Sequence, residues 1–249
     1  MTGNVRGAED SIRRFNSARI VEHGLLIAIF AVLLVTGLSQ KFHSLESAQW
    51  LIIHMGGIDA VRLMHRYSGI AFSILVSVHI AVGILGVGLF RWEPSMFIKK
   101  SDLTNAVHNI KYYLGLKEQP APSDRYGYKQ KFIYWSVLCG GVLMVCTGLI
   151  LWFPITIVRF LPGEIVPTAK ALHTNEALLI FLLVALWHIY DSIFSPDVFP
   201  LDKNIFTGRI SRERMLREHP LELARISGGD PGDPPHPVED NLPPQGNGN

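Results

Sequence analysis

Five histidines lie inside or beside long apolar stretches of this chain: His23, His65, His79, His173 and His188. Ionisable side chains within a lipid bilayer are costly, and they usually serve a function. Neutral imidazole is a good ligand for haem iron, and a flat apolar porphyrin fits between apolar helices. These residue types in these positions therefore predict bis-histidine sites for haem b, with the imidazoles as axial ligands of the iron.

The apolar residues that surround these histidines are gathered in four blocks. The blocks cover about residues 20–38, 67–90, 132–153 and 169–194. Each is close to the roughly 20 residues that a helix needs to cross a hydrocarbon core of about 30 Å. The predicted fold class is therefore all-α: a transmembrane four-helix bundle with haems between the helices and membrane lipid around them.

Basic residues set the expected orientation of the bundle. Lys and Arg concentrate before the first block, between the second and third, and after the fourth, whereas the 39–62 and 154–168 loops hold few. Basic segments stay in the cytoplasm, so both termini are expected there, with the chain in the bacterial inner membrane. The predicted division is a cytoplasmic N-terminal segment (1–19), a transmembrane cytochrome domain (20–194), a cytoplasmic extension (195–226) and a Pro/Gly-rich tail (227–249). A partner is expected to hold the tail.

The spacing of the histidines predicts two layers. His65 and His79 are fourteen residues apart, and His173 and His188 are fifteen apart. Each spacing is about four helical turns, with a rise of about 21 Å for the first pair and about 22 Å for the second. If the two helices are parallel, His65 faces His173 in an outer layer and His79 faces His188 in an inner one. His23 lies at the depth of the inner layer, so either His23 or His79 is the partner of His188. A third haem with an incomplete ligand set is a further alternative.

A weak internal repeat bears on this choice. "VLLVTGL" at 32–38 resembles "VLMVCTGLI" at 142–150, and "LMHRYSGIAFSILVSVHI" at 63–80 resembles "ALHTNEALLIFLLVALWHI" at 171–189. Two such hairpins in parallel order predict a pseudo-twofold axis along the membrane normal. The repeat favours His79 as the partner of His188, because the position equivalent to His23 is Tyr134.

Two other functions use the same residues differently. If the histidines are structural, the chain is a non-redox membrane anchor. If they conduct protons or metal ions, the chain is a transporter, which would usually also have carboxylates within the membrane. Glu176 and Asp191 are the only carboxylates near, and both lie toward the ends of the last span. The histidines of the loops and tail are read as structural: His43, His54, His108, His219 and His236. Cys139 and Cys146 are two turns apart, about 10 Å, and are read as packing residues. No C-x-x-C-H motif for c-type haem occurs, and no nucleic-acid partner is expected.

Several segments resemble cytochrome b/b6-domain proteins, the gamma subunits of formate dehydrogenases and the cytochromes b of nickel-iron hydrogenases. They include "RIVEHGLLIAIFAVLLVTG", "LMHRYSGIAFSILVSVH" and "ALHTNEALLIFLLVALWHIYDSIFSPDVFP". The resemblance implies two b haems in an electron-transfer subunit of an oxidoreductase complex. That subunit works between the quinone pool and a periplasmic iron–sulfur or multihaem c-type subunit. It also implies the pairs His65 with His173 and His23 with His188.

The resemblance further implies a quinone site beside the inner haem. In "RYGYKQKF", Gln130 and Lys131 match the family motif, whereas Gly127 stands where the family has Asn. The residues implied for quinone hydrogen bonding or proton delivery are listed here: Glu22, His23, Tyr128, Gln130 and Lys131. No side chain is assigned as a catalytic residue.

Overall fold

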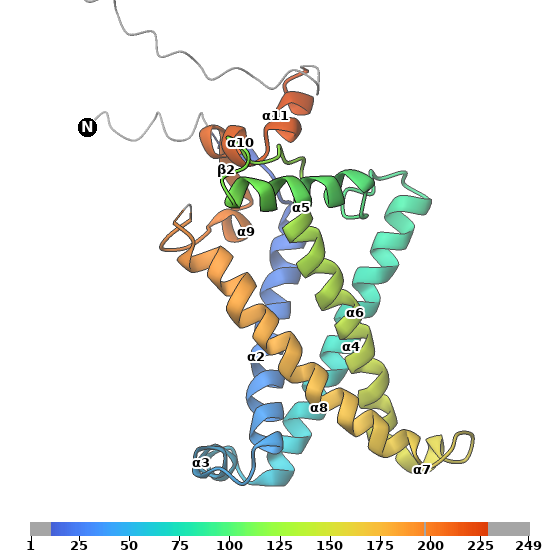
Figure 1. Ribbon diagram of the computed structural model, residues 1–249. Coiled ribbons are helices and arrows are strands. Elements are labelled where there is room, and N and C mark those ends of the chain that lie inside the picture. Colours follow the sequence, from blue (N-terminus) through green and yellow to red (C-terminus); the bar gives the residue numbers. More distant parts are fainter. Residues whose placement is uncertain (1–10, 197, 229–249) are drawn as a thin grey trace, which may run out of the picture. The chain divides into compact units, whose positions relative to one another are not determined.

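The computed structural model describes residues 11–196 and 198–228, and these form mostly helices (Figure 1). Four stretches among them are long and apolar enough to cross a membrane: α2 (Ser17–Lys41), α4 (Ile58–Gly88), α6 (Tyr128–Trp152) and Ile165–Phe194. The predicted all-α fold with four membrane-spanning helices is confirmed, and the chain is a multi-pass integral membrane protein. Because α4 begins at Ile58 rather than near residue 67, His65 lies well inside a helix.

The remaining elements are short. They are α3 (Glu46–His54), α5 (Lys100–Tyr113), α7 (Pro154–Ile157), α9 (Asn204–Thr207), α10 (Arg212–Glu218), α11 (Pro220–Ile226), β1 (Ser11–Arg13) and β2 (Arg209–Ser211). Of these, α3 lies in the first loop, α5 lies in the central loop, and α10 and α11 follow the last span. The two strands pair in a small sheet, which the sequence did not predict. The expected binding of the C-terminal tail to a partner concerns residues 229–249, which lie outside the described part.

The last span is not a regular α-helix along its whole length. It continues α8 (Ile165–Leu183) with two π-helical stretches, η1 (Val184–His188) and η2 (Tyr190–Phe194). A π turn takes up one residue more than an α turn, and such turns often occur at functional sites. The fifteen residues from His173 to His188 therefore span about four turns, which brings both imidazoles to one face of the span.

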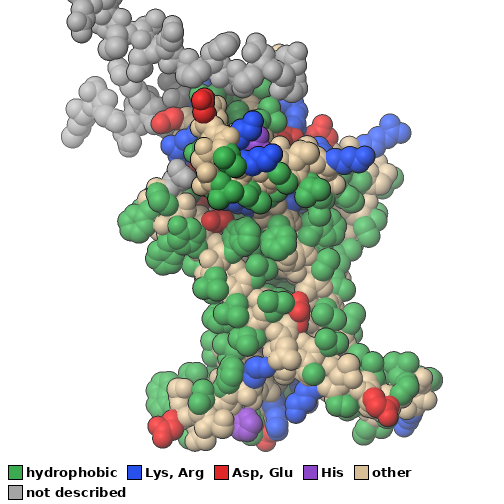
Figure 2. Space-filling view, viewed as in Figure 1, with side chains coloured by type: hydrophobic (Ala, Val, Ile, Leu, Met, Phe, Trp, Pro, Cys, Tyr) green, Lys and Arg blue, Asp and Glu red, His purple; other side chains and the backbone are tan. Residues whose placement is uncertain are grey.

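The four spans belong to one compact unit, formed by residues 13–96 and 129–209. Within it, α2 and α4 run antiparallel and pack along each other (Figure 1). Glycines bring α6 close to both of its neighbours: a Cβ at Gly141 would lie 3.2 Å from Phe72 of α4, and Gly140 faces Ile180 of α8. Many large apolar side chains of the spans are exposed, and nearly all the others are only half-buried; hydrophobic atoms cover much of the surface of the spans in Figure 2. This surface is the one expected to contact lipid.

Among the described residues, the second unit combines residues 11–12, 97–128 and 210–228. Its core consists of Ile210, Met215 and Leu223, which are at most 2% exposed. His219 donates a hydrogen bond from Nδ1 to the Asp124 carbonyl at 2.9 Å, which ties the C-terminal extension to the central loop. The central loop and the C-terminal extension thus fold together, an association that their separation in sequence does not reveal.

Candidate functional site

His65 of α4 and His173 of α8 face each other. Their ring centroids are 6.3 Å apart, and the ring planes are at 77°. Both residues lie about two turns from the start of their helices, which run in parallel, so the two imidazoles lie at the same level of the bundle. The structure thus brings together the two residues that the sequence assigned to one layer.

A threonine lies behind each of these imidazoles. The Thr36 hydroxyl donates a hydrogen bond to the Val32 carbonyl at 2.6 Å, and its oxygen is 2.9 Å from His65 Nδ1. A hydroxyl has one proton and two lone pairs. With the proton directed at the carbonyl, the oxygen accepts a hydrogen bond from Nδ1–H. The His65 tautomer that results carries its free lone pair on Nε2.

The same arrangement recurs at the other imidazole. The Thr147 hydroxyl donates to the Leu143 carbonyl at 2.7 Å and is 2.9 Å from His173 Nδ1. Both threonines are buried, at 1% and 3% exposure. In both arrangements the threonine oxygen accepts a hydrogen bond from Nδ1–H. The Nε2 atoms of His65 and His173 are therefore both left available as ligands.

A glycine follows each threonine and gives the imidazole room. A Cβ at Gly37 would lie 3.2 Å from His65 Cε1, and one at Gly148 would lie 3.4 Å from His173 Cε1. A side chain at either position would press on the ring. The repeated Thr-Gly pair that marks the internal repeat therefore forms the support of the His65–His173 pair. Sequence reasoning recognised the repeat but did not assign these residues to the site.

His23 of α2 and His188 of η1 form the second facing pair. Their ring centroids are 6.1 Å apart, and the ring planes are at 72°. His23 is positioned by the start of α2, where Asn16 caps the helix by accepting the Arg19 amide at 3.0 Å. Among the described residues, neither imidazole of this pair has a hydrogen-bonding partner. The two pairs thus share their spacing but differ in their support.

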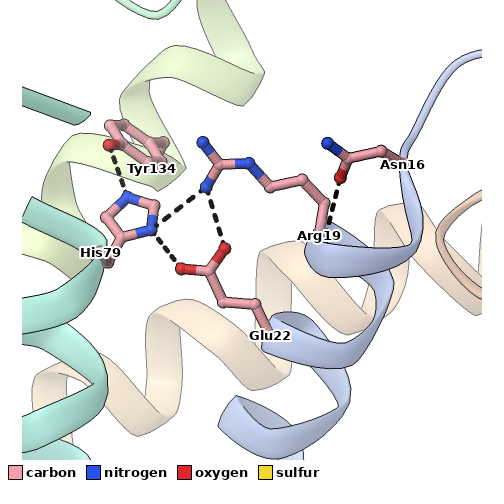
Figure 3. Close-up of polar contacts among 5 residues, drawn as sticks. All are labelled: Asn16, Arg19, Glu22, His79 and Tyr134. Atoms are coloured by element: carbon pink, nitrogen blue, oxygen red, sulfur yellow. Dashed lines mark hydrogen bonds and ion pairs between the residues drawn. The ribbon is translucent and has the colours of Figure 1, made fainter. Parts of the chain in front are cut away.

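His79 lies in a polar cluster with Arg19, Glu22 and Tyr134 (Figure 3), and its ring faces Tyr134, whereas the ring of His188 faces His23. Its Nδ1 is 2.5 Å from Glu22 Oε1, and its Nε2 is 2.9 Å from the Tyr134 hydroxyl. Arg19 pairs with Glu22 Oε2 at 2.9 Å and approaches His79 Nδ1 at 3.3 Å. Both ring nitrogens of His79 are therefore engaged by side chains of α2 and α6.

The internal repeat accounts for this position of His79. Tyr134 occupies the place in α6 that His23 occupies in α2, and it faces His79 with ring centroids 5.7 Å apart. His23 faces His188 in the same way. At this depth, one pair of facing residues is thus His23 and His188. The pair equivalent to it in the repeat is Tyr134 and His79, which are joined by a direct hydrogen bond.

The other candidate residues occupy varied positions. Glu22 lies in the cluster with His79, Gln130 is exposed, and Lys131 is buried in the first turn of α6. Tyr128 is the first residue of α6, and it ends the 97–128 segment of the other compact unit. His43, His54, His108 and His219 each have a ring nitrogen within hydrogen-bonding distance of a backbone carbonyl, whereas His236 lies outside the described part. Cys139 and Cys146 are free thiols.

The chain is similar to membrane-bound b-type cytochromes. Residues 81–198 match the family described as prokaryotic cytochrome b561. The cytochrome b556(fdo) subunit of formate dehydrogenase from Escherichia coli K12 is 25% identical over 189 residues, which cover 74% of this chain and 80% of that protein. The nitrate-inducible b556(Fdn) subunit of the same strain is 24% identical over 205 residues, with 80% and 83% covered. The b556 subunit of Haemophilus influenzae formate dehydrogenase is 26% identical over 186 residues, with 72% and 69% covered.

Proposed function

Because this chain is similar to membrane-bound cytochromes b, among them the cytochrome b556 subunits of formate dehydrogenases, we propose that it transfers electrons across the membrane. The electrons pass between the quinone pool and a redox partner in a respiratory complex. Two haems b, one in each histidine pair, carry them. The pairs are His65 with His173 and His23 with His188.

The spacing of the two pairs is the observation that supports this proposal most directly. Two metal–imidazole bonds of about 2 Å each, with about 1 Å from each nitrogen to its ring centre, separate the ring centres by about 6 Å. The observed separations are 6.3 Å and 6.1 Å. A direct hydrogen bond between imidazoles would bring the rings closer than this. The donor set, two neutral imidazoles between apolar helices, also fits haem b.

The protein's own residues hold and orient the ligands. A bound haem b supplies reversible one-electron chemistry at its iron. Thr36 and Thr147 fix the rings of one pair, and the glycines beside them leave space for those rings. The pairs stand at opposite ends of the spans, about 20 Å apart along the bundle by the helical rise. This spacing suits electron transfer across most of the hydrocarbon core.

We place quinone chemistry at the end of the bundle that carries His23, which the basic-residue pattern assigns to the cytoplasm. Glu22 directly precedes His23 in α2 and is itself part of a polar cluster: it contacts Arg19 and His79, and His79 contacts Tyr134. Quinone reduction takes up two electrons and two protons, so it needs hydrogen-bonding groups beside the electron donor. The cluster supplies such groups within the membrane-spanning part of the chain.

The relatives are named as subunits of formate dehydrogenases. By analogy, this chain would assemble with other subunits of a respiratory complex. The expected partner contacts the end of the bundle near His65 and His173 and carries iron–sulfur clusters or multiple c-type haems. The distribution of basic residues assigns this end of the bundle to the periplasm, so the partner is expected to be periplasmic.

Reduction of the purified protein by quinols tests the proposal. A ubiquinol and a menaquinol analogue are each mixed with oxidised protein, and the absorbance of reduced haem b is followed against the full reduction given by dithionite. At least one quinol is expected to reduce the haem. Tyr134→Phe is expected to slow this step at unchanged haem content, whereas the exposed Tyr67→Phe of α4 serves as the matched control and leaves it unchanged. Haem that dithionite reduces but neither quinol reduces would contradict the quinone role.

A further inference from the structure

The Thr-Gly pairs of α2 and α6 lie behind only one of the two histidine pairs. Thr36 and Thr147 accept Nδ1–H of His65 and His173, each at 2.9 Å. Among the described residues, His23 and His188 have no such acceptor. Each half of the internal repeat contributes one threonine, and both threonines support the His65–His173 pair. The two histidine pairs therefore differ in hydrogen bonding, although the two halves of the repeat are alike.

We propose that Thr36 and Thr147 are positioning residues that set the tautomer, ring orientation and basicity of the His65–His173 ligands, and so lower the midpoint potential of the haem held there. This inference rests on the proposed function, because it takes the pair to be axial ligands. It adds a role for two side chains to which neither the family match nor the sequence motifs assign one.

The hydrogen-bond geometry carries the argument. Each threonine hydroxyl donates to the carbonyl of the residue four positions earlier, at 2.6 Å and 2.7 Å, so its rotation is fixed by its own helix. The oxygen lone pair therefore points at Nδ1 before any ligand binds. A hydrogen bond at the second nitrogen of a metal-bound imidazole fixes its orientation and raises its basicity. A more basic ligand stabilises the oxidised iron relative to the reduced iron, which lowers the potential.

The burial of the threonines strengthens the effect. Thr36 and Thr147 are almost fully enclosed, and each hydroxyl is also bonded to a carbonyl of its own helix. Water has no room to replace the hydroxyl as acceptor. Because Gly37 and Gly148 let the rings approach this closely, the hydroxyl and the glycine act together, and neither would hold the ring at this position without the other.

Redox titration of the purified haem-loaded protein tests the proposal. Thr36→Val and Thr147→Val keep the side-chain shape and remove the acceptor, whereas Thr36→Ser and Thr147→Ser keep the hydroxyl. Each Val variant is expected to raise the midpoint potential of one haem and to change its ferric electron paramagnetic resonance signal. The potential of the other haem, held by His23 and His188, stays at the wild-type value. Both Ser variants are expected to match the wild-type protein.

The possible outcomes separate this inference from the proposed function. Loss of one haem in the Val variants, with retention in the Ser variants, also supports a role of the hydroxyl. Val variants that keep both haems with unchanged potentials and signals would overturn the inference and leave the haem sites standing. Ser variants that behave like Val variants would show that a retained hydroxyl does not preserve the wild-type potential, and would also overturn the inference. Absence of haem from the wild-type protein would contradict the proposed function itself.

Discussion

At the scale of single residues, the central distinction is between a histidine that faces another histidine and one that is already hydrogen-bonded at both nitrogens. His23 faces His188 across 6.1 Å. His79, at a similar depth, contacts Glu22 through one nitrogen and Tyr134 through the other. A histidine whose two nitrogens are both committed to side chains has no lone pair to offer to iron without losing a bond.

Alanine substitution separates these two roles. His79→Ala is expected to retain two haems per chain, because it removes a polar contact and leaves both facing pairs intact. His188→Ala and His23→Ala are each expected to lose one of the two. The measurement is the ratio of haem b to protein after purification, determined from the pyridine haemochrome spectrum.

His65→Ala is the matched control, because it removes a ligand of the other pair and is also expected to leave one haem. If His79→Ala lost a haem while His23→Ala kept both, His188 would be paired with His79, as the internal repeat favours, and the proposed pairing of His188 with His23 would be wrong.

The sequence could predict which histidines lie at one level but not which of them meet. Residue spacing and helical rise were enough to bring His65 and His173 together. The partner of His188 depends on how α2, α4 and α6 pack, since that packing directs His79 toward Tyr134 and leaves His23 facing His188. Sequence periodicity does not contain this information.

At the scale of elements, α4 shows how glycine fixes the end of a span. Its last residue is Gly88, and the chain then folds back so that the Trp92 amide donates to the Gly86 carbonyl at 2.9 Å. A Cβ at Gly86 would overlap the indole ring of Trp92, whereas one at Gly83 would meet nothing within 4 Å. The two glycines lie one turn apart on the same helix and form a matched pair.

Gly86→Ala is therefore expected to destabilise the folded protein and Gly83→Ala is not. Overpacking of this kind costs about 1–3 kcal/mol, while Gly→Ala in an unobstructed helix position stabilises by about 0.5–1 kcal/mol. The measurement is thermal unfolding of the detergent-solubilised protein. Adding Trp92→Ala to Gly86→Ala should recover part of the loss; strictly additive effects would show that the indole ring is not what the new methyl group meets.

The membrane spans were readable from hydropathy, yet two features of the elements were not. Regular α geometry leaves His188 rotated by about 60° from His173, and the π turn of η1, which lies between the two residues, removes much of that offset. π turns have no reliable sequence signal. The joining of residues 97–128 with the C-terminal extension depends on contacts such as Arg225 with Asp124, which are far apart in sequence.

At the scale of the whole molecule, charge sets the expected orientation. The first loop, between α2 and α4, is poor in Lys and Arg, whereas the segment between α4 and α6 is rich in them. With α2 and α4 antiparallel, these two segments leave the spans at opposite ends. The positive-inside rule then assigns the second segment and both termini to the cytoplasm.

Reporter fusions test this orientation. Alkaline phosphatase is active only in the periplasm, and green fluorescent protein of the standard type fluoresces only in the cytoplasm. Fusion of phosphatase after Gly57 should give activity, and fusion after Lys117 or Asn249 should give none, with the fluorescent reporter showing the reverse pattern. Phosphatase activity at Lys117 together with none at Gly57 would invert the assignment of the quinone-reactive end.

The haem content of the purified protein, combined with the electron paramagnetic resonance spectrum of its oxidised form, tests the central claim most directly. The facing imidazole planes lie at 77° and 72°, and near-perpendicular axial imidazoles give highly anisotropic low-spin ferric signals. Two haems b per chain, both with signals of this kind, are the predicted result. A protein without haem b, or with a single haem that survives replacement of His173 and His188 together, would contradict the account.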